Sequence, residues 1–303
     1  MKVIVAAPRG FCAGVTRAVD IVERALERWG APVYVRHEIV HNKRVVSELA
    51  AKGAVFVEEV DEVPADRPLI FSAHGISPRV RGAAAERDLR VIDATCPLVT
   101  KVHSEAKRCN RQGYELVYIG HHGHDEAIGT MGEAPQAMHL VETAEDVEKL
   151  DIPAGKKVAY LTQTTLGVDE TEGVIAALQR RFPDLASPPK DDICYAATNR
   201  QVAVKRMAPL CDVVLVVGSQ NSSNAHRLVE VAKANGAYSY LIDGPQDVQP
   251  SWLAGAATVG VTGSASTAEA AVRELIESLH PDSVEELRAV DENVFFNLPP
   301  EVR

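Results

Sequence analysis

The stretch CPLVTKVHSEAKRCNRQG, residues 96–113, follows a plan that the chain repeats in two other places. A cysteine opens the stretch, apolar residues follow at helical spacing, and a glycine closes it. The first copy, CAGVTRAVDIVERALERWG, begins at Cys12, and the third, CYAATNRQVAVKRMAPL, begins at Cys194. The three copies predict three helices that each begin directly after a cysteine.

Each of these helices leads into a strand, a polar turn, a helix, a strand, an acidic turn, a short helix and a last strand. The runs ELVYI (115–119), KVAYL (157–161) and VVLVV (213–217) are short, apolar and without alternation, which is typical of parallel strands buried on both faces. Strands that alternate with helices indicate an α/β fold. Repetition at about 85 to 100 residues predicts three such domains, related by a pseudo-threefold axis and each with a small parallel sheet.

The repeats also suggest domain boundaries. We expect domain 1 at residues 1–97, domain 2 at 98–193 and domain 3 at 194–280. The C-terminal segment 281–303 lies outside the repeats, and we expect it to pack back onto domain 1.

Composition excludes several classes of protein. Acidic residues outnumber basic ones, 42 against 32, and the sequence has no cluster of lysine and arginine that could neutralise a row of phosphates. We therefore expect no nucleic-acid partner. The apolar run in MKVIVAAPRG is too short for a signal peptide, and no later run reaches the roughly 18 residues of a membrane span. We expect a cytoplasmic protein, or a stromal one in a plastid-bearing organism, with no membrane partner.

The five cysteines fall into two groups. No C-x-x-C occurs, which argues against a zinc finger, and the odd number and wide spacing argue against a disulfide framework. Cys12, Cys96 and Cys194 occupy the same place in each repeat, whereas Cys109 and Cys211 do not, and we expect the latter two in the core. A pseudo-threefold arrangement would bring the three equivalent thiols together. They could hold an iron–sulfur cluster with one open iron, or zinc together with a histidine.

Polar turns at the carboxyl ends of the expected strands form a second equivalent set. Parallel sheets bind ligands at this edge. His41, His124 and Asn224 stand 28 to 30 residues after their repeat cysteines. In the polar turn of each repeat, in chain order, the polar residues are His41; His124 with Glu126; and Ser222, Ser223 and Asn224. After the last strand of each repeat they are His74; Thr164 with Thr165; and Ser264 with Ser266.

This set is rich in neutral donors and contains few lysines or arginines, which suits a small phosphorylated ligand. Glu126 is its best-placed carboxylate, and in a desolvated pocket beside His124 its pKa would rise enough for proton delivery. The seven other histidines are expected to be structural or at the surface: His37, His103, His121, His122, His139, His226 and His280.

Nine stretches together resemble the 4-hydroxy-3-methylbut-2-enyl diphosphate reductase family, which catalyses the last step of the methylerythritol phosphate route to isoprenoids. The resemblance runs from Met1 to about His280 and continues more weakly to NVFFNLP (293–299). The stretches are PRGFCAGVTRAVDIVERAL (8–26), EIVHNKRVV (38–46), FSAHGISP (71–78), DATCPLVTKVH (93–103), IGHHGHDEAIGTMGE (119–133), TQTTLGVDET (162–171), DDICYAATNRQVAV (191–204), VVGSQNSSNAHRLVEVA (216–232) and GVTGSAST (260–267).

The resemblance implies a three-domain α/β trefoil around a [4Fe–4S] cluster. Cys12, Cys96 and Cys194 would be its protein ligands, and the open iron would bind the substrate hydroxyl. Glu126 would be the proton source, working with His124 and Thr164, with Thr165 a lesser candidate. The residues that would hold the diphosphate are His41, His74, His124, Ser222, Ser223, Asn224 and Ser266.

The same resemblance implies reductive removal of the allylic hydroxyl, with isopentenyl and dimethylallyl diphosphate as products. The electrons would come from a ferredoxin or flavodoxin, docked by charge complementarity.

Three other functions fit the sequence less well. A zinc hydrolase using HHGHDE (121–126) fits poorly, because Glu126 and Ala127 follow Asp125 where H-x-H-x-D-H needs a histidine, and H-E-x-x-H is absent. An iron–sulfur sensor would need the cysteines but not a diphosphate site. A nicotinamide enzyme would need a G-x-G-x-x-G after a strand, and none occurs.

Overall fold

The computed structural model describes all residues from 1 to 303, and they form two compact units. Each unit is an α/β body of its own. Unit 1 consists of Met1–Thr16, Val40–Glu48 and Tyr195–Phe296, and unit 2 of Arg17–Ile39, Leu49–Cys194 and Asn297–Arg303.

Unit 1 contains one five-stranded parallel sheet. Its order is β10–β9–β11–β1–β12. The strands are β1 Lys2–Ala7, β9 Val213–Val217, β10 Tyr238–Ile242, β11 Thr258–Gly263 and β12 Ser283–Arg288. Every residue of β9 is buried, as expected for a strand covered on both faces.

Helices cover both faces of this sheet. Residues of α8 (Tyr195–Met207) and α9 (Ser223–Ala234) pack with Ile4 and Val214 on one face. Residues of α11 (Glu269–Ser278) pack with Val5 and Leu215 on the other. The short α10 (Pro250–Leu253) adds Trp252 to this second layer, where its ring stacks on Tyr240 with centroids 3.9 Å apart.

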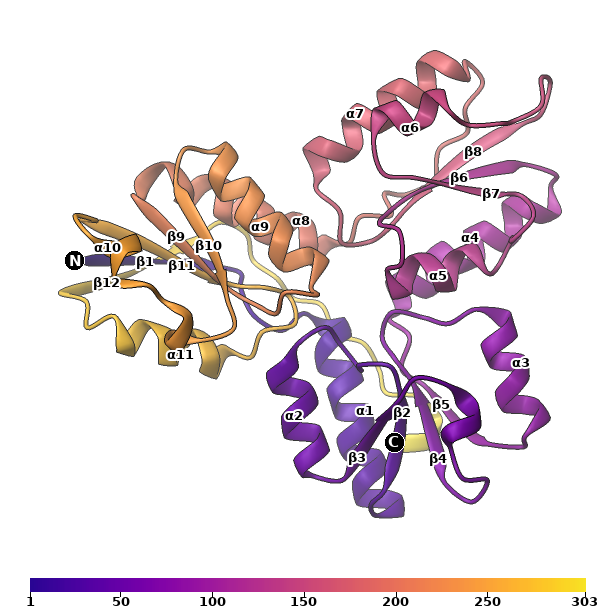
Figure 1. Ribbon diagram of the computed structural model, residues 1–303, viewed down its shortest axis with the longest axis horizontal. Helices are drawn as coiled ribbons and strands as arrows, with labels where there is room; N and C mark the ends of the chain where they lie inside the picture. The colour runs from indigo at the N-terminus through magenta and orange to yellow at the C-terminus, as the bar shows by residue number, and fades with distance from the viewer. The chain divides into compact units, whose positions relative to one another are not determined.

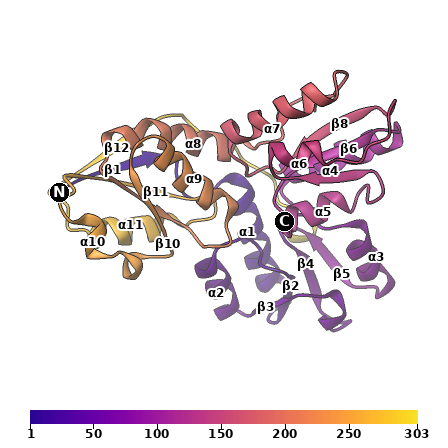
Figure 2. The ribbon, with the colours of Figure 1, turned by 45° about the horizontal axis from the view of Figure 1, so that its top comes forward.

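Unit 2 contains two smaller parallel sheets, ordered β3–β2–β4–β5 and β7–β6–β8. Figure 2 shows α3 (Pro78–Glu86), which connects β4 to β5, beside these two strands. The strands are β2 Val33–Arg36, β3 Ala54–Val57, β4 Pro68–Phe71, β5 Arg90–Asp93, β6 Glu115–Ile119, β7 Met138–Val141 and β8 Val158–Thr162.

In unit 2, α3, α5 and α6 each connect two parallel strands of one sheet, whereas α4 leads from the first sheet to the second and α7 follows β8. Figure 1 shows α4 and α5 on one side of the second sheet and α6 and α7 on the other. Leu116 and Tyr118 pack with residues of α4 and α5, whereas Val117 and Ile119 pack with residues of α6 and α7. These helices are α4 Pro97–Arg111, α5 Asp125–Met131, α6 Ala144–Glu148 and α7 Val168–Arg181, and the first sheet adds α3 Pro78–Glu86. Two further helices, α1 Ala13–Trp29 and α2 Lys43–Ala51, have residues in both units.

The expected α/β class with three small parallel sheets is confirmed. The three helices predicted after the cysteines are α1, α4 and α8, and each begins one residue after its cysteine. Gly30 ends α1 in the left-handed conformation, with φ of 72°. No helix combines the length and the apolar character that crossing a bilayer requires.

The segment that precedes each repeat cysteine pairs with the last strand of another repeat, which for Cys12 is the third repeat. β5, before Cys96, pairs with β4, and a bridge joins Ala186, before Cys194, to Ala159 of β8. β1, before Cys12, pairs in the same way with β11. The sheet that contains β9, β10 and β11 therefore also includes β1, from the N-terminal part of the chain, and β12, from the C-terminal segment.

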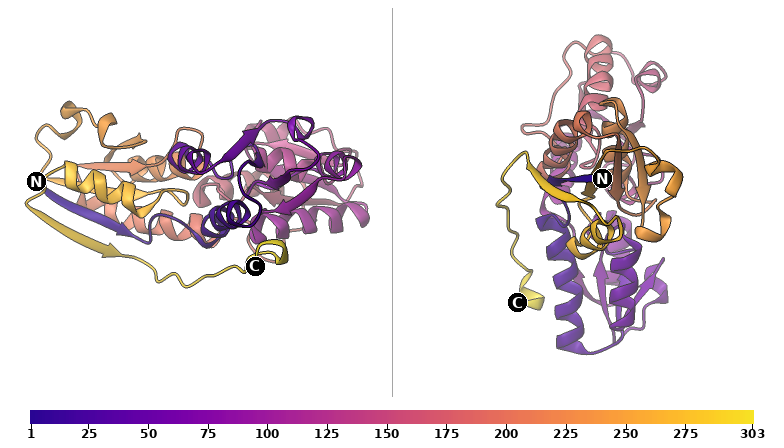
Figure 3. Two further views of the ribbon diagram at one scale, coloured as in Figure 1. Left: turned by 90° about the horizontal axis from the view of Figure 1, so that it is seen from below. Right: turned by 90° about the vertical axis from the view of Figure 1, so that its left-hand side faces the viewer.

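The C-terminal segment runs back along the N-terminal part of the chain. Figure 3 shows β12 beside β1, with which it pairs from Lys2 to Ala7. The last residues belong to unit 2, where Arg17 Nε donates to the carbonyl of Asn297 and Arg28 donates to that of Glu301. The segment thus supplies an edge strand to one sheet and backbone acceptors to α1.

A buried arginine ties three segments of unit 1 together. The Arg200 side chain is 1% exposed, and it donates to the carbonyls of Gly10, at 2.7 Å, and Ala196, at 3.0 Å. It also pairs with the Glu292 carboxylate at 3.1 Å. Arg200 therefore holds the loop before Cys12 and the first turn of α8 against the C-terminal segment.

We expect Arg200→Ala to lower the free energy of unfolding by about 3–5 kcal/mol, because it leaves a largely buried carboxylate without its partner. Urea unfolding followed by circular dichroism measures this loss. The matched control is Arg206→Ala, on the same helix, whose guanidinium donates to the exposed Ala289 carbonyl and whose loss should cost less than about 1 kcal/mol. Equal losses in the two variants would contradict the bridging role of Arg200.

Candidate active site

Each of the three repeat cysteines makes the same kind of backbone hydrogen bond. The N–H of Cys12 donates to the carbonyl of Ala265 at 3.0 Å, that of Cys96 to Ala73 at 3.0 Å, and that of Cys194 to Thr164 at 2.9 Å. Each acceptor is the second residue after a last strand, since β11 ends at Gly263, β4 at Phe71 and β8 at Thr162. Each bond lies within one unit, so every cysteine is fixed at the carboxyl edge of a sheet.

The surroundings of these cysteines differ from those of Cys109 and Cys211. Cys12, Cys96 and Cys194 are partly exposed, and each directly precedes the first residue of a helix. Cys109 and Cys211 are buried in hydrophobic clusters, and desolvation raises the pKa of both thiols. The expectation that these two are core residues is confirmed.

Glu126 lies in the first turn of α5 with its carboxylate enclosed by protein. The residue is 2% exposed. Thr164 donates to both carboxylate oxygens, with its backbone N–H at 2.6 Å and its hydroxyl at 2.9 Å. Because the carbonyl of Thr164 also accepts the N–H of Cys194, one residue joins the carboxylate to the cysteine.

Burial sets the protonation of Glu126. Desolvation raises the pKa of its carboxyl to about 7, with a smaller contribution from the charge of Asp192, although both hydrogen bonds from Thr164 oppose the shift. A carboxyl with this pKa holds its proton in a large share of molecules at neutral pH. Such a group has the protonation state that a general acid needs.

His124 is the N-cap of α5. Its Nδ1 accepts the backbone N–H of Glu126 at 3.1 Å, so a neutral ring carries its proton on Nε2. The ring meets that of His74 edge-on, with centroids 6.0 Å apart. Unit 2 thus brings His74, His124, Glu126 and Thr164 into one local group.

Unit 1 holds the second part of the expected set. Ser222 is the N-cap of α9, where its hydroxyl accepts the N–H of Ala225 at 3.3 Å. The Asn224 side-chain oxygen accepts the N–H of Ala265 at 2.8 Å. The Ser266 hydroxyl donates to the carbonyl of His41 at 3.0 Å. Ser223 is the first residue of α9, between Ser222 and Asn224.

These contacts correct one equivalence between the repeats. The sequence distances matched His124 with Asn224, but His124 and Ser222 are both N-caps. Glu126 and Asn224 are the true counterparts, because each accepts the N–H of the residue whose carbonyl binds a repeat cysteine. In the remaining repeat the backbone carbonyl of Ile39 accepts the N–H of Ala73 instead.

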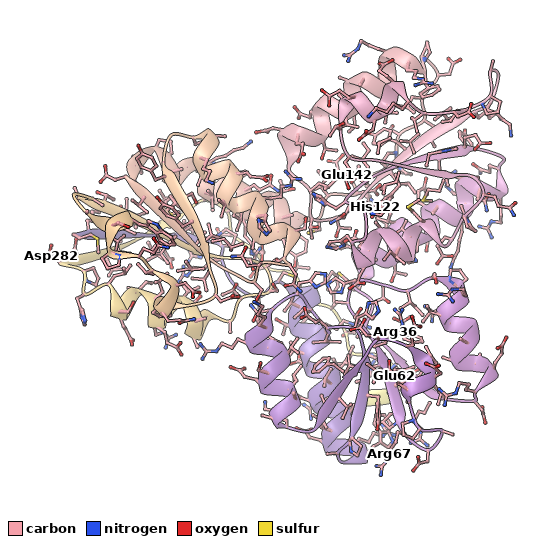
Figure 4. All side chains as sticks on the ribbon, viewed as in Figure 1. Arg36, Glu62, Arg67, His122, Glu142 and Asp282 are labelled. Atoms are coloured by element: carbon pink, nitrogen blue, oxygen red, sulfur yellow. The ribbon has the colours of Figure 1, made fainter.

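The other members of HHGHDE are held by local contacts. The backbone N–H of His121 donates to Gln163 Oε1 at 3.0 Å, and the Gln163 amide donates to Thr165 Oγ1 at 2.9 Å. The backbone N–H of His122 donates to the Glu142 carboxylate, and Figure 4 labels both residues. His122 is exposed, as expected for a surface histidine.

Sequence reasoning missed a pair that involves Asp125 and His37. The two side chains are 2.7 Å apart, and the other Asp125 oxygen is 3.9 Å from His74. His37 had been expected to be structural or at the surface. One signal was available, because His37 directly follows β2 at the same sheet edge as His74.

Comparison with known proteins gives concordant matches. The family model described as LytB protein matches residues 3–280. A 4-hydroxy-3-methylbut-2-enyl diphosphate reductase of Azoarcus sp. is 56% identical over all of this chain and 98% of its own, and one of Mycobacterium ulcerans is 56% identical over all of this chain and 92% of its own. The solved E-1-hydroxy-2-methyl-but-2-enyl-4-diphosphate reductase of Plasmodium falciparum has a TM-score of 0.97 and 38% identity, covering all of this chain and 96% of that one.

Glu126→Gln should change how stability depends on pH. The folded wild-type carboxyl has a pKa of about 7, above its ordinary value of 4.5, so the folded state binds more protons and stability falls as pH rises through this window. The loss amounts to about 3 kcal/mol and is complete above the folded pKa, whereas glutamine has no such titration.

Urea unfolding at pH 4.5, 6, 7 and 8 measures the effect as the difference between wild type and variant. Between pH 4.5 and pH 8, the free energy of unfolding of the variant should increase by about 3 kcal/mol relative to that of wild type. The exposed Glu145→Gln is the control and should follow wild type at every pH. Parallel curves for Glu126→Gln and wild type would show that Glu126 is not an abnormal acid.

Proposed function

The chain belongs to the LytB protein family, and we propose that it is a reductase that converts 4-hydroxy-3-methylbut-2-enyl diphosphate into isopentenyl and dimethylallyl diphosphate. The observation that carries this proposal is the buried Glu126 carboxyl, held by Thr164, which also fixes Cys194. This arrangement places an acid with a pKa of about 7 beside a residue of the proposed metal site.

LytB-family enzymes are iron–sulfur proteins, and the donor set of this chain fits such a group. Three partly exposed thiols sit at the starts of three helices, in the same backbone setting. We assign Cys12, Cys96 and Cys194 as the ligands of a [4Fe–4S] cluster, which leaves one iron without a protein ligand. No histidine or carboxylate is assigned to the metal.

When bound, the cluster supplies a Lewis acid for the allylic oxygen and passes two electrons, one at a time. The reaction also consumes two protons. Glu126 delivers one of them to the departing hydroxyl, which leaves as water, and the other goes to one of two carbons of the allyl group. Thr164 fixes both oxygens of Glu126, so the acid is held in one orientation.

The diphosphate is proposed to bind to hydroxyl, amide and imidazole donors, which match its many acceptor oxygens. His124 offers an Nε2–H because its Nδ1 is occupied by the N–H of Glu126. Thr165 adds a lesser contact. The other proposed contacts are His41, His74, Ser222, Ser223, Asn224 and Ser266.

We propose a ferredoxin or flavodoxin as the electron donor, because the reaction needs single electrons. We also propose a reducing compartment, cytoplasm or plastid stroma, for the reaction. The five cysteines form no disulfide in this structure, which is what a reducing compartment favours.

Cys96→Ser should abolish or strongly lower the iron and sulfide content, since it removes one of three ligands. We expect about four irons and four sulfides per chain in anaerobically purified wild type. Cys109→Ser, a change of the same kind 13 residues along the same helix, should leave the content unchanged. One zinc and no sulfide in the wild type would refute the assignment.

Glu126→Gln should keep the cluster and substrate binding but lose most turnover, because glutamine cannot supply the proton. In wild type, turnover should fall about tenfold per pH unit above the Glu126 pKa of about 7. Reoxidation of a reduced viologen dye by the substrate measures both effects. Normal turnover by Glu126→Gln would remove Glu126 from the mechanism.

A further inference from the structure

The two oxygens of Asp125 face two different histidines. Oδ1 lies 2.7 Å from His37 Nδ1, a hydrogen-bonding distance, and Oδ2 lies 3.9 Å from His74 Nδ1. All three side chains are mostly buried, with 19% of Asp125, 21% of His37 and 13% of His74 exposed. The carboxylate therefore stands between a histidine that the proposed mechanism uses and one that it does not.

His37 is held in an unusual backbone conformation. Its φ is 57°, in the left-handed region that non-glycine residues rarely adopt. Its backbone N–H donates to the carbonyl of Val57 at 2.8 Å, and its Nε2 is 3.5 Å from the exposed Glu58 carboxylate. Strain of this kind persists where the surroundings fix it, and it is frequent at functional sites.

The backbone beneath His74 is fixed independently of Asp125. Gly75 has φ of 84°, and a Cβ there would lie 3.0 Å from His103 Nε2. A Cβ on Gly129 of α5 would lie 3.2 Å from the Gly75 carbonyl, so the helix backbone packs directly on this turn. These glycine contacts hold the main chain that carries His74 against α5, the helix on which Asp125 lies.

We propose that Asp125 and His37 form a positioning pair for His74, in which the nearby charge of Asp125 attracts the imidazole and favours its protonated form while His37 neutralises Asp125. The inference rests on the proposed function, in which His74 binds the diphosphate. In this proposal Asp125 and His37 act through His74.

Each member of the pair has a separate physical task. A carboxylate near Nδ1 stabilises the imidazolium, which binds a phosphate oxygen more strongly than a neutral ring does. An uncompensated carboxylate would also repel the diphosphate, and His37 cancels that charge. The Asp125 hydrogen bond raises the pKa of His37, which keeps the ring protonated to higher pH.

Other charged or titratable groups lie around the pair, and two of them shift the pKa of His37 in opposite directions. Arg36, at the end of β2, lowers the pKa of His37, and Glu58, after β3, raises it. His124 meets the His74 ring from the start of α5, and the ring of His103 lies under Gly75 from α4. None of these replaces Asp125, whose carboxylate lies within 4.0 Å of both rings.

The test compares Asp125→Asn, His37→Gln and the double variant with wild type, using KM and kcat of the cluster-loaded enzyme from pH 6 to 9. KM should rise with pH as His74 loses its proton. Asp125→Asn should raise KM about tenfold near pH 8, and the pH at which KM begins to rise should be about one unit lower than in wild type. Its kcat should stay within about twofold, because Glu126 keeps its contacts. The Ki of inorganic diphosphate should rise with KM.

His37→Gln should also raise KM, because it uncovers the charge of Asp125. The KM of the double variant should be no higher than that of Asp125→Asn alone, because removing His37 has no further effect once the Asp125 carboxylate is gone. His139→Gln is the matched control, because His139 pairs with Glu115 at 3.2 Å in the same unit but outside the site, and it should leave KM unchanged. Additive effects in the double variant would overturn the pairing.

His74→Asn separates failure of this inference from failure of the proposed function. If wild type does not reduce the substrate, the proposed function itself is wrong. If His74→Asn leaves KM unchanged in an active enzyme, His74 does not bind the diphosphate and the inference falls with that role. If His74→Asn raises KM but Asp125→Asn changes neither KM nor its pH profile, the positioning pair alone is refuted.

Discussion

A single backbone hydrogen bond, from the N–H of each repeat cysteine to a carbonyl two residues beyond a strand, sets the positions on which the site depends. It occurs at Cys12, Cys96 and Cys194 with lengths of 2.9 to 3.0 Å. A strand end is rigid because it belongs to a sheet, whereas an isolated loop is not. The bond therefore transfers the rigidity of three sheets to three thiols and to the helices that follow them.

The same motif explains why an acid lies next to this framework. The residue that accepts the cysteine N–H donates its own N–H to Glu126 in one repeat, to Asn224 in another and to the carbonyl of Ile39 in the third. Three chemically different acceptors thus serve one structural purpose. Only a carboxyl can also carry a proton, and the burial that this position imposes raises the pKa of Glu126.

Close backbone packing complements these hydrogen bonds in unit 2. Gly75 and Gly129 let α5 rest directly on the turn that carries His74. The N-cap of that helix, His124, then has a fixed ring orientation. Together these contacts give the polar turns a definite geometry although they are loops, which is what a binding site on a sheet edge requires.

Much of this protein follows from the sequence by itself. Helical periodicity after Cys12, Cys96 and Cys194, and unbroken apolar runs such as 213–217, determine the elements and the α/β class, because side-chain period and burial are local properties. The acid Glu126 and the core positions of Cys109 and Cys211 also follow from local patterns. Only the tertiary structure decided that β1 pairs with β11, that Glu126 corresponds to Asn224, and that Asp125 lies between His37 and His74. These facts depend on contacts between residues distant in the chain, and no local pattern encodes which distant backbone group or side chain will meet another.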